Sequence, residues 1–129
     1  MACVVLHISP NASDAASLSR MMADCPLSFV HVPNVREANR VLKEQYFPVI
    51  LTEVHLEDGD WKEVLAAARQ AHRETEVVVT VPAADVRLWA EVINLGGYDI
   101  LVQPFESSEV HRVLLSAAAS TPAHLSIAV

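Results

Sequence analysis

Residues 49–61 read Val49-Ile50-Leu51-Thr52-Glu53-Val54-His55-Leu56-Glu57-Asp58-Gly59-Asp60-Trp61, and they contain one copy of the unit from which the whole chain is built. The apolar run at the start has the length of a buried strand and predicts a strand over 49–51. A polar, turn-like segment follows over 53–60, and Asp60 is a suitable N-cap for a helix. The apolar positions of that helix recur at helical spacing and are Trp61, Val64, Leu65 and Ala68.

The same order of strand, polar loop and helix repeats along the rest of the chain. Short apolar runs predict strands over 4–8, 29–32, 76–81 and 100–102. Apolar residues three and four positions apart predict the helices between and after them. The expected inward positions are Leu18, Met21, Met22 and Cys25 in the first helix, Val35, Ala38, Val41 and Leu42 in the second, Leu88, Trp89 and Val92 in a helix over 84–95, and Val110, Val113, Leu114 and Ala117 in a last helix from Glu106.

Five strands that alternate with five helices predict a single α/β domain with a parallel sheet and helices on both faces. In such sheets the functional residues lie at the carboxyl ends of the strands. The loops of interest are therefore 9–11, the segment that begins at 53, 80–82 and 103–105.

Composition excludes several classes of function. The chain has 129 residues and a net charge of −7, without a cluster of Lys or Arg, which argues against nucleic-acid binding. No apolar run could span a membrane, and the N-terminus lacks the features of a secretory signal, so we expect a cytoplasmic protein. With only three glycines, the chain has no glycine-rich phosphate loop, which argues against a small flavin or nucleotide binder.

Three segments resemble the receiver domain of response regulators, the CheY-like superfamily, and the resemblance covers about residues 3–119. Residues 51–61 are similar to the family's strand-3 motif L-x-D-x-x-L-P-D-G-D-G. Residues 78–80 match the family's strand-4 run, which ends in Thr or Ser, and residues 97–105 are similar to G-A-x-D-Y-L-x-K-P-F. The resemblance implies a flavodoxin-like three-layer sandwich with strand order 2-1-3-4-5 and a role in bacterial two-component or phosphorelay signalling.

The sequence departs from the family at the residues that carry phosphoryl transfer. The resemblance places Glu53 at the position of the phospho-accepting aspartate, and Gln103 at that of the lysine. The acidic pair that helps to hold magnesium falls on Ser9 and Pro10, while Thr80 retains the family's residue. A second switch position, aromatic in the family, is Ile100 here.

These departures predict an atypical receiver that is not an enzyme and has no catalytic residues. Magnesium needs several hard oxygen ligands, so Glu53 alone predicts weak or absent binding and no cofactor. Gln103 supplies no full positive charge, and the longer Glu53 side chain disturbs the in-line geometry of transfer. The alternative is a receiver that is transiently phosphorylated at Glu53. Glu53 itself has two interpretations, as a permanent mimic of phosphoaspartate or as a solvated carboxylate in an abandoned pocket.

Other polar and aromatic residues have simpler interpretations. His55 lies two residues beyond Glu53, and His7 lies on the neighbouring first strand, but no paired His or Cys spacing supports a metal site. Trp61 and Trp89 are expected to pack inside. The resemblance implies a cis peptide between Gln103 and Pro104, and we expect it to place Phe105 in the core.

Output is expected through a protein partner or through self-association, because the chain carries no effector domain. The receiver-like domain is predicted over 1–120 and a C-terminal tail over 121–129. In the family, the contact commonly uses the face made by helix 4, strand 5 and helix 5. The corresponding residues here are Asp85, Leu88, Glu91, Ile93, Tyr98, Ile100 and Leu101, with Val110, His111 and Leu114 as further members.

Overall fold

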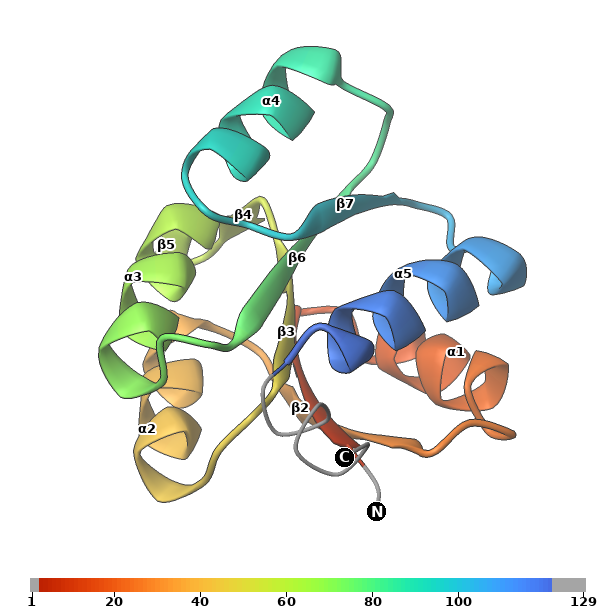
Figure 1. The fold of residues 1–129 in the computed structure, drawn as a ribbon, viewed down its shortest axis with the longest axis horizontal. Coiled ribbons are helices and arrows are strands. Elements are labelled where there is room, and N and C mark those ends of the chain that lie inside the picture. The colour runs from red at the N-terminus through yellow and green to blue at the C-terminus, as the bar shows by residue number, and fades with distance from the viewer. Residues whose placement is uncertain (1–2, 122–129) are drawn as a thin grey trace.

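A computed structural model describes residues 3–121 of the chain. The strands and helices alternate along the sequence as expected (Figure 1). The strands are β1 (Cys3–Ile8), β2 (Leu27–Val32), β3 (Val49–Glu53), β4 (His55–Leu56), β5 (Gly59–Asp60), β6 (Glu76–Val81) and β7 (Asp99–Val102). The helices are α1 (Ala12–Met21), α2 (Val35–Glu44), α3 (Trp61–Ala71), α4 (Val86–Asn94) and α5 (Ser107–Ala119).

Five strands form one parallel sheet in the order β2-β1-β3-β6-β7, which is the predicted order 2-1-3-4-5 when the long strands alone are counted. The helices α2 and α3 lie on one side of this sheet and α1 and α5 on the other, while α4 lies beside β7 (Figure 1). The predicted fold class is therefore confirmed. No helix within residues 3–121 has the length and apolar character needed to cross a membrane.

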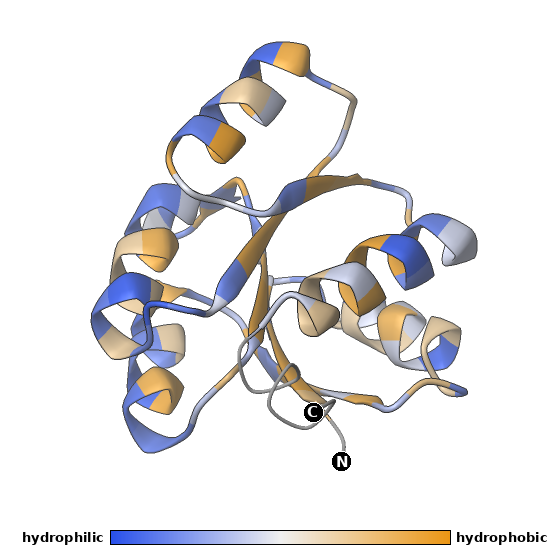
Figure 2. Ribbon diagram, viewed as in Figure 1, coloured by the Kyte–Doolittle hydropathy of each residue, from blue (hydrophilic) through white to orange (hydrophobic). Residues whose placement is uncertain are grey.

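Two apolar clusters hold the layers together. One contains Leu6, Ile8, Val77 and Val79 with side chains of α2, α3 and α4, and the other contains Val5, Leu51 and Val78 with side chains of α1 and α5. Successive side chains of a strand point to opposite faces, so each central strand contributes to both clusters. The hydrophobic colouring along the strands in Figure 2 reflects this burial on two sides.

Polar side chains define where the helices begin. Asn11, Asn34, Asp60 and Asp85 each accept a backbone N–H bond at a helix N-terminus, which confirms Asp60 as a cap. The first helix ends at Met21, so Cys25 lies outside it, contrary to the apolar spacing. Pro26 follows directly, and the residue before a proline is disfavoured in helical conformation.

Two further expectations need correction. The segment predicted as a plain turn over 53–60 contains a short antiparallel hairpin, in which β4 pairs with β5. Trp61 is buried as predicted, but Trp89 is 45% exposed. On α4 Val92 is buried and Leu88 is half-buried, so these two residues lie on the side of the helix that faces the core. Trp89 comes one position after Leu88 and is therefore rotated away from that side. The predicted tail lies outside the described residues, except for Thr121.

Candidate functional site at the carboxyl ends of the strands

The sheet brings three of the predicted site residues to one edge. Ile8 of β1 is in register with Thr52 of β3, and Glu53 is in register with Thr80 of β6. Ser9 follows β1 directly, so the ends of these three neighbouring strands place Ser9, Glu53 and Thr80 side by side. This is the edge at which parallel α/β sheets carry their functional groups.

Ser9 is entirely buried, and its hydroxyl donates a hydrogen bond of 2.5 Å to Oε2 of Glu53. The same hydroxyl accepts the backbone N–H of Asn11 at 3.0 Å, and the Ser9 carbonyl lies 2.7 Å from Nε2 of His31. All polar groups of Ser9 are thus engaged, because its N–H also bonds to Val32. A buried serine therefore orients one oxygen of the carboxylate, and the adjacent Pro10 is exposed and contributes no ligand group.

The Gln103 side chain forms a hydrogen bond that the sequence did not indicate. Its Nε2 donates to Oδ2 of Asp14 at 2.9 Å, and its backbone N–H donates to Val81 at 2.7 Å. Asp14 lies in the first turn of α1, so this bond joins the loop after β7 to the helix after β1. From the sequence, Asp14 suggests only a possible helix cap, although a carboxylate in the first turn of the helix after β1 was the available signal. The peptide between Gln103 and Pro104 is cis, as predicted.

The two switch-equivalent positions are both placed at the expected strands. Thr80 is buried, and its hydroxyl lies 3.4 Å from the carbonyl of Thr52, a long hydrogen bond. Ile100 is half-buried and packs against the cluster under α2 and α3. Phe105 is half-buried and packs against the other cluster, which is less complete burial than the core position expected for it.

The histidines do not gather around Glu53. His55 is exposed on β4, whereas His7 is buried in β1 on the side of α1 and α5. The His7 ring lies 5.3 Å from that of His31, and Nδ1 of His7 is buried without a hydrogen-bond partner among residues 3–121. Burial, and to a lesser degree His31, lowers the pKa of His7 from 6.5 to about 4. Within residues 3–121 no three His, Cys, Asp or Glu side chains converge as metal ligands would.

The loop after Glu53 is tied to α2 rather than open. Asp58 accepts the backbone N–H groups of Val35 and Arg36 at 2.9 and 3.0 Å, and Glu57 accepts the Asn34 side chain at 2.9 Å. The N–H groups at the start of α2 lower the pKa of Asp58. These acidic residues, interpreted from sequence as a turn, thus join the segment after β3 to the N-terminus of α2.

Only some residues of the predicted contact face are exposed to solvent. Leu101, Val110 and Leu114 are buried, so they belong to the core and cannot contact a partner. Burial follows from their place on the sheet-facing side of β7 and α5. Apolar residues that the sequence analysis did not select are exposed instead, namely Val86 at 80%, Trp89 at 45% and Val102 at 41%, beside the predicted Ile93 at 38%.

Comparison with known proteins places this edge in context. No protein-family model matches the chain. A curated relative, the response regulator protein PilR of Pseudomonas aeruginosa, is 24% identical over 84 residues, which cover 65% of this chain. The chain spans about a fifth of that relative's length, 19%.

Solved structures resemble the chain over nearly its whole length. The signal receiver domain of a protein described as a Luxo repressor of Vibrio parahaemolyticus has a TM-score of 0.84 and 21% identity, with 92% of this chain and 91% of that chain covered. A beryllofluoride-activated NtrC4 receiver domain dimer has a TM-score of 0.78 and 26% identity, with 94% and 98% covered.

A third neighbour, the receiver domain of the sensor histidine kinase PA1611 of Pseudomonas aeruginosa, holds a magnesium ion in its active-site cleft. Its TM-score is 0.77 at 19% identity, with 92% of this chain and 99% of that chain covered. These neighbours are all signal receiver domains, and the present chain has their fold, the flavodoxin-like receiver fold of response regulators.

Proposed function

We propose that this chain is a pseudo-receiver, a signalling module of the two-component type that acts through protein contacts and without phosphorylation. The observation that carries the proposal is the pair of hydrogen bonds at the strand ends, Ser9 to Glu53 and Gln103 to Asp14. They engage the two residues that stand at the nucleophile and lysine positions. As a signalling module of this kind it would act in the cytoplasm and would not be an enzyme.

Phosphoryl transfer requires a carboxylate free to attack, a cation for the charge that develops, and oxygen ligands for a metal. Here Oε2 of Glu53 accepts a buried hydroxyl, and Gln103 offers an uncharged amide that is bonded elsewhere. Losing one electrostatic stabiliser commonly costs about 3–4 kcal/mol of barrier, and this site lacks more than one. The alternative of transient phosphorylation at Glu53 has no such observation in its favour.

The donor set does not fit magnesium. Mg²⁺ is held in proteins by carboxylate oxygens and waters in near-octahedral geometry. Ser9 and Pro10 provide no carboxylate after β1, and the Asp14 carboxylate accepts the amide of Gln103. We therefore infer that magnesium binds weakly or not at all, and no step of the proposed mechanism uses it.

The orientation of Glu53 favours a structural role over phosphate mimicry. Its carboxylate joins the end of β3 to the end of β1 through Ser9, and within the described residues it makes no hydrogen bond to Thr80 or Gln103. A phosphoaspartate mimic would be expected to engage those two positions. The pocket would accordingly hold one conformation, set by its own side chains.

Output would then depend on the surface formed by α4 and β7. Val86, Trp89 and Ile93 follow one another at intervals of three and four residues along the exposed side of α4, and Val102 is exposed on β7. Exposed apolar side chains that gather on neighbouring elements are a mark of interaction sites, and α4 contacts β7. We assign the contact with a protein partner or a second copy to this face.

The phosphorylation state provides the direct test. The purified chain is incubated with acetyl phosphate and magnesium and measured by intact-mass spectrometry, beside a receiver domain with an intact acidic pair as positive control. The proposal predicts no phosphorylated species for this chain. A phosphorylated species that disappears in Glu53→Ala would refute it.

A further inference from the structure

A hollow opens at the same edge of the sheet, beside the residues Ser9, Glu53 and Thr80. It is a cleft of about 540 Å³ between the start of the β3–β4 segment and the loop that leads from β6 into α4. Val54, which follows Glu53, lines one wall, and Val81, which follows Thr80, lines the other. The remaining wall comes from the loop and first turn of α4, residues 82–88.

The lining is mostly apolar, with few polar groups at the rim. Val81 is buried, Val54 and Leu88 are half-buried, and the loop contributes proline and alanine side chains. Asp85 also lines the cleft, but its carboxylate accepts the N–H of Leu88 as the cap of α4. Apolar walls with a few polar groups are typical of small-molecule sites, and this volume lies within their usual range of about 300–1,000 Å³.

Two rim residues supply donors that the protein does not use. Arg87 and His55 are exposed, and neither side chain forms a hydrogen bond or ion pair with another residue of the described chain. Arg87 is the only Lys or Arg among the residues that line the cleft, and its guanidinium can pair with an anionic group of a ligand. The cleft lies at the carboxyl edge of the sheet, beyond the neighbouring ends of β3 and β6.

We propose that this cleft binds a small organic carboxylate with an aliphatic or aromatic body, whose acid group pairs with Arg87. The apolar body would lie against Val54, Val81 and Leu88. A ligand there would touch both the segment after Glu53 and the loop after Thr80, and would give the module a chemical input in place of phosphate. This role as an input rests on the proposed function.

Two tryptophans lie near the cleft, so their intrinsic fluorescence can be used to detect binding. The Trp61 backbone N–H donates to the Val54 carbonyl at 3.0 Å, so α3 begins at one wall. Trp89 lies on α4 one turn beyond Val86, which lines the cleft. Binding should therefore alter the fluorescence of the chain, and amide NMR signals should locate it.

The test uses 3-phenylpropanoate and its neutral amide, 3-phenylpropanamide, in NMR titrations of the full chain. The acid should shift the amide signals of 54–55 and 81–88 with a dissociation constant of about 1 mM, which is typical of a ligand of this size. Because the pairing is exposed, the amide should bind about threefold more weakly.

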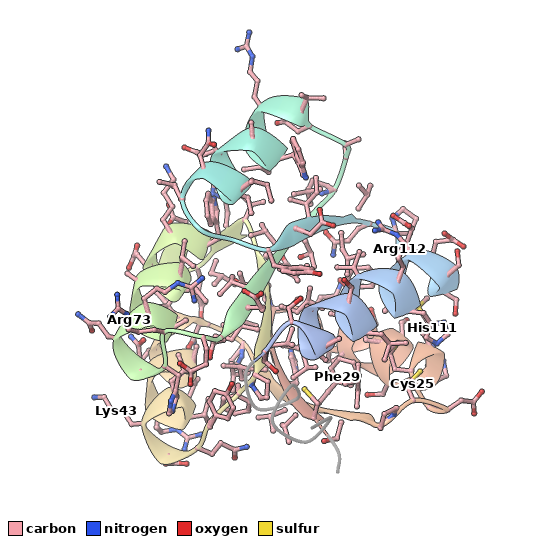
Figure 3. All side chains as sticks on the ribbon, viewed as in Figure 1. Cys25, Phe29, Lys43, Arg73, His111 and Arg112 are labelled. Atoms are coloured by element: carbon pink, nitrogen blue, oxygen red, sulfur yellow. The ribbon has the colours of Figure 1, made fainter. Side chains whose placement is uncertain are left out.

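Variants distinguish binding in the cleft from non-specific binding elsewhere on the chain. Arg87→Gln should remove the preference for the acid, and Ala84→Trp, which fills the cleft at an exposed position, should abolish binding of both compounds. Arg73→Gln is the matched control, because Arg73 points outward just after α3 (Figure 3), and this variant should leave both affinities unchanged. Absence of shifts at about 10 mM acid, shifts elsewhere on the chain, or unchanged binding in Ala84→Trp would overturn the proposal.

Discussion

At the carboxyl ends of β1 and β3 polar side chains bond to one another, whereas along α4 apolar side chains face solvent. Ser9 and Glu53 satisfy each other in the first region, while Val86, Trp89 and Ile93 are exposed in the second. The first region stands where receiver domains carry their chemistry, and the second offers what a protein partner would bury. Under the proposed function, internal hydrogen bonds take the place of phosphoryl chemistry in the first region, while the second region provides the contact with a partner.

The two tryptophans give the largest expected contrast between interior and surface. Trp61→Ala should lower the free energy of unfolding by about 3–5 kcal/mol, because the ring is buried in the cluster under α2 and α3. Trp89→Ala should lower it by less than about 1 kcal/mol, because nearly half of this side chain is exposed. Urea denaturation of both variants measures the contrast. Equal losses would mean that α4 packs more tightly than described.

Acid should lower the free energy of unfolding through His7, which is buried in β1 two residues before Ser9. Its pKa is lowered from 6.5 to about 4 in the folded chain, so the neutral ring is favoured there. The free energy of unfolding therefore has its full value above pH 6.5. It decreases as the pH falls from 6.5 through 4, by about 3 kcal/mol in total. His7→Leu should flatten the pH dependence of unfolding in that window, as measured by urea denaturation.

The exposed His55 provides the matched control for this titration. His55→Asn should leave the loss of stability between pH 6.5 and 4 unchanged, since the side chain lies at the surface. A pH dependence that survives in His7→Leu would assign the effect to other groups.

Ser9→Ala tests the bond that closes the pocket. Glu53 would lose its buried donor, and we expect the free energy of unfolding to fall by about 1–2 kcal/mol. Ser19→Ala, at an exposed position of α1, should change it by less than about 0.5 kcal/mol. If the two variants behave alike, Ser9 does not hold Glu53 in solution.

The smallest effect is expected from restoring only part of the family's chemistry. Glu53→Asp combined with Gln103→Lys should remain unphosphorylated by acetyl phosphate, because Ser9 and Pro10 still provide no metal ligand. Asp14 would moreover be placed to pair with the new lysine, since it already binds position 103. Phosphorylation of this double variant by intact mass would show that the acidic pair is dispensable.

Much of the fold followed from local patterns. Apolar runs of strand length and helical spacing predicted the five long strands and the helices between them, and Asp60 was recognisable as a cap from its position before Trp61. The order of the strands in the sheet was implied by the resemblance to receiver domains. Helix ends were less predictable, because Cys25 continues an apolar spacing that Pro26 interrupts. Trp89 was wrongly predicted to be buried. Its spacing shows that it belongs to an apolar set of helix positions, but not which of those positions face the sheet.

The candidate site was predictable in its positions but not in its bonds. The resemblance placed Ser9, Glu53, Thr80 and Gln103 together, and the strand registers agree for the first three. The bond between Gln103 and Asp14 spans 89 positions and depends on how two loops meet, which no local pattern encodes. The same holds for Asp58, whose carboxylate reaches the start of α2 across the loop.

The central claim is that the pocket at the strand ends no longer accepts a phosphoryl group. The most direct measurement is an NMR titration of the chain with beryllofluoride, an analogue of the phosphoryl group, in the presence of magnesium. The account predicts that the amide signals of Ser9, Glu53 and Thr80 stay unchanged, because Glu53 is bonded to Ser9 and the donor set does not fit the metal. Saturable shifts at these three residues that are lost in Glu53→Ala would contradict it.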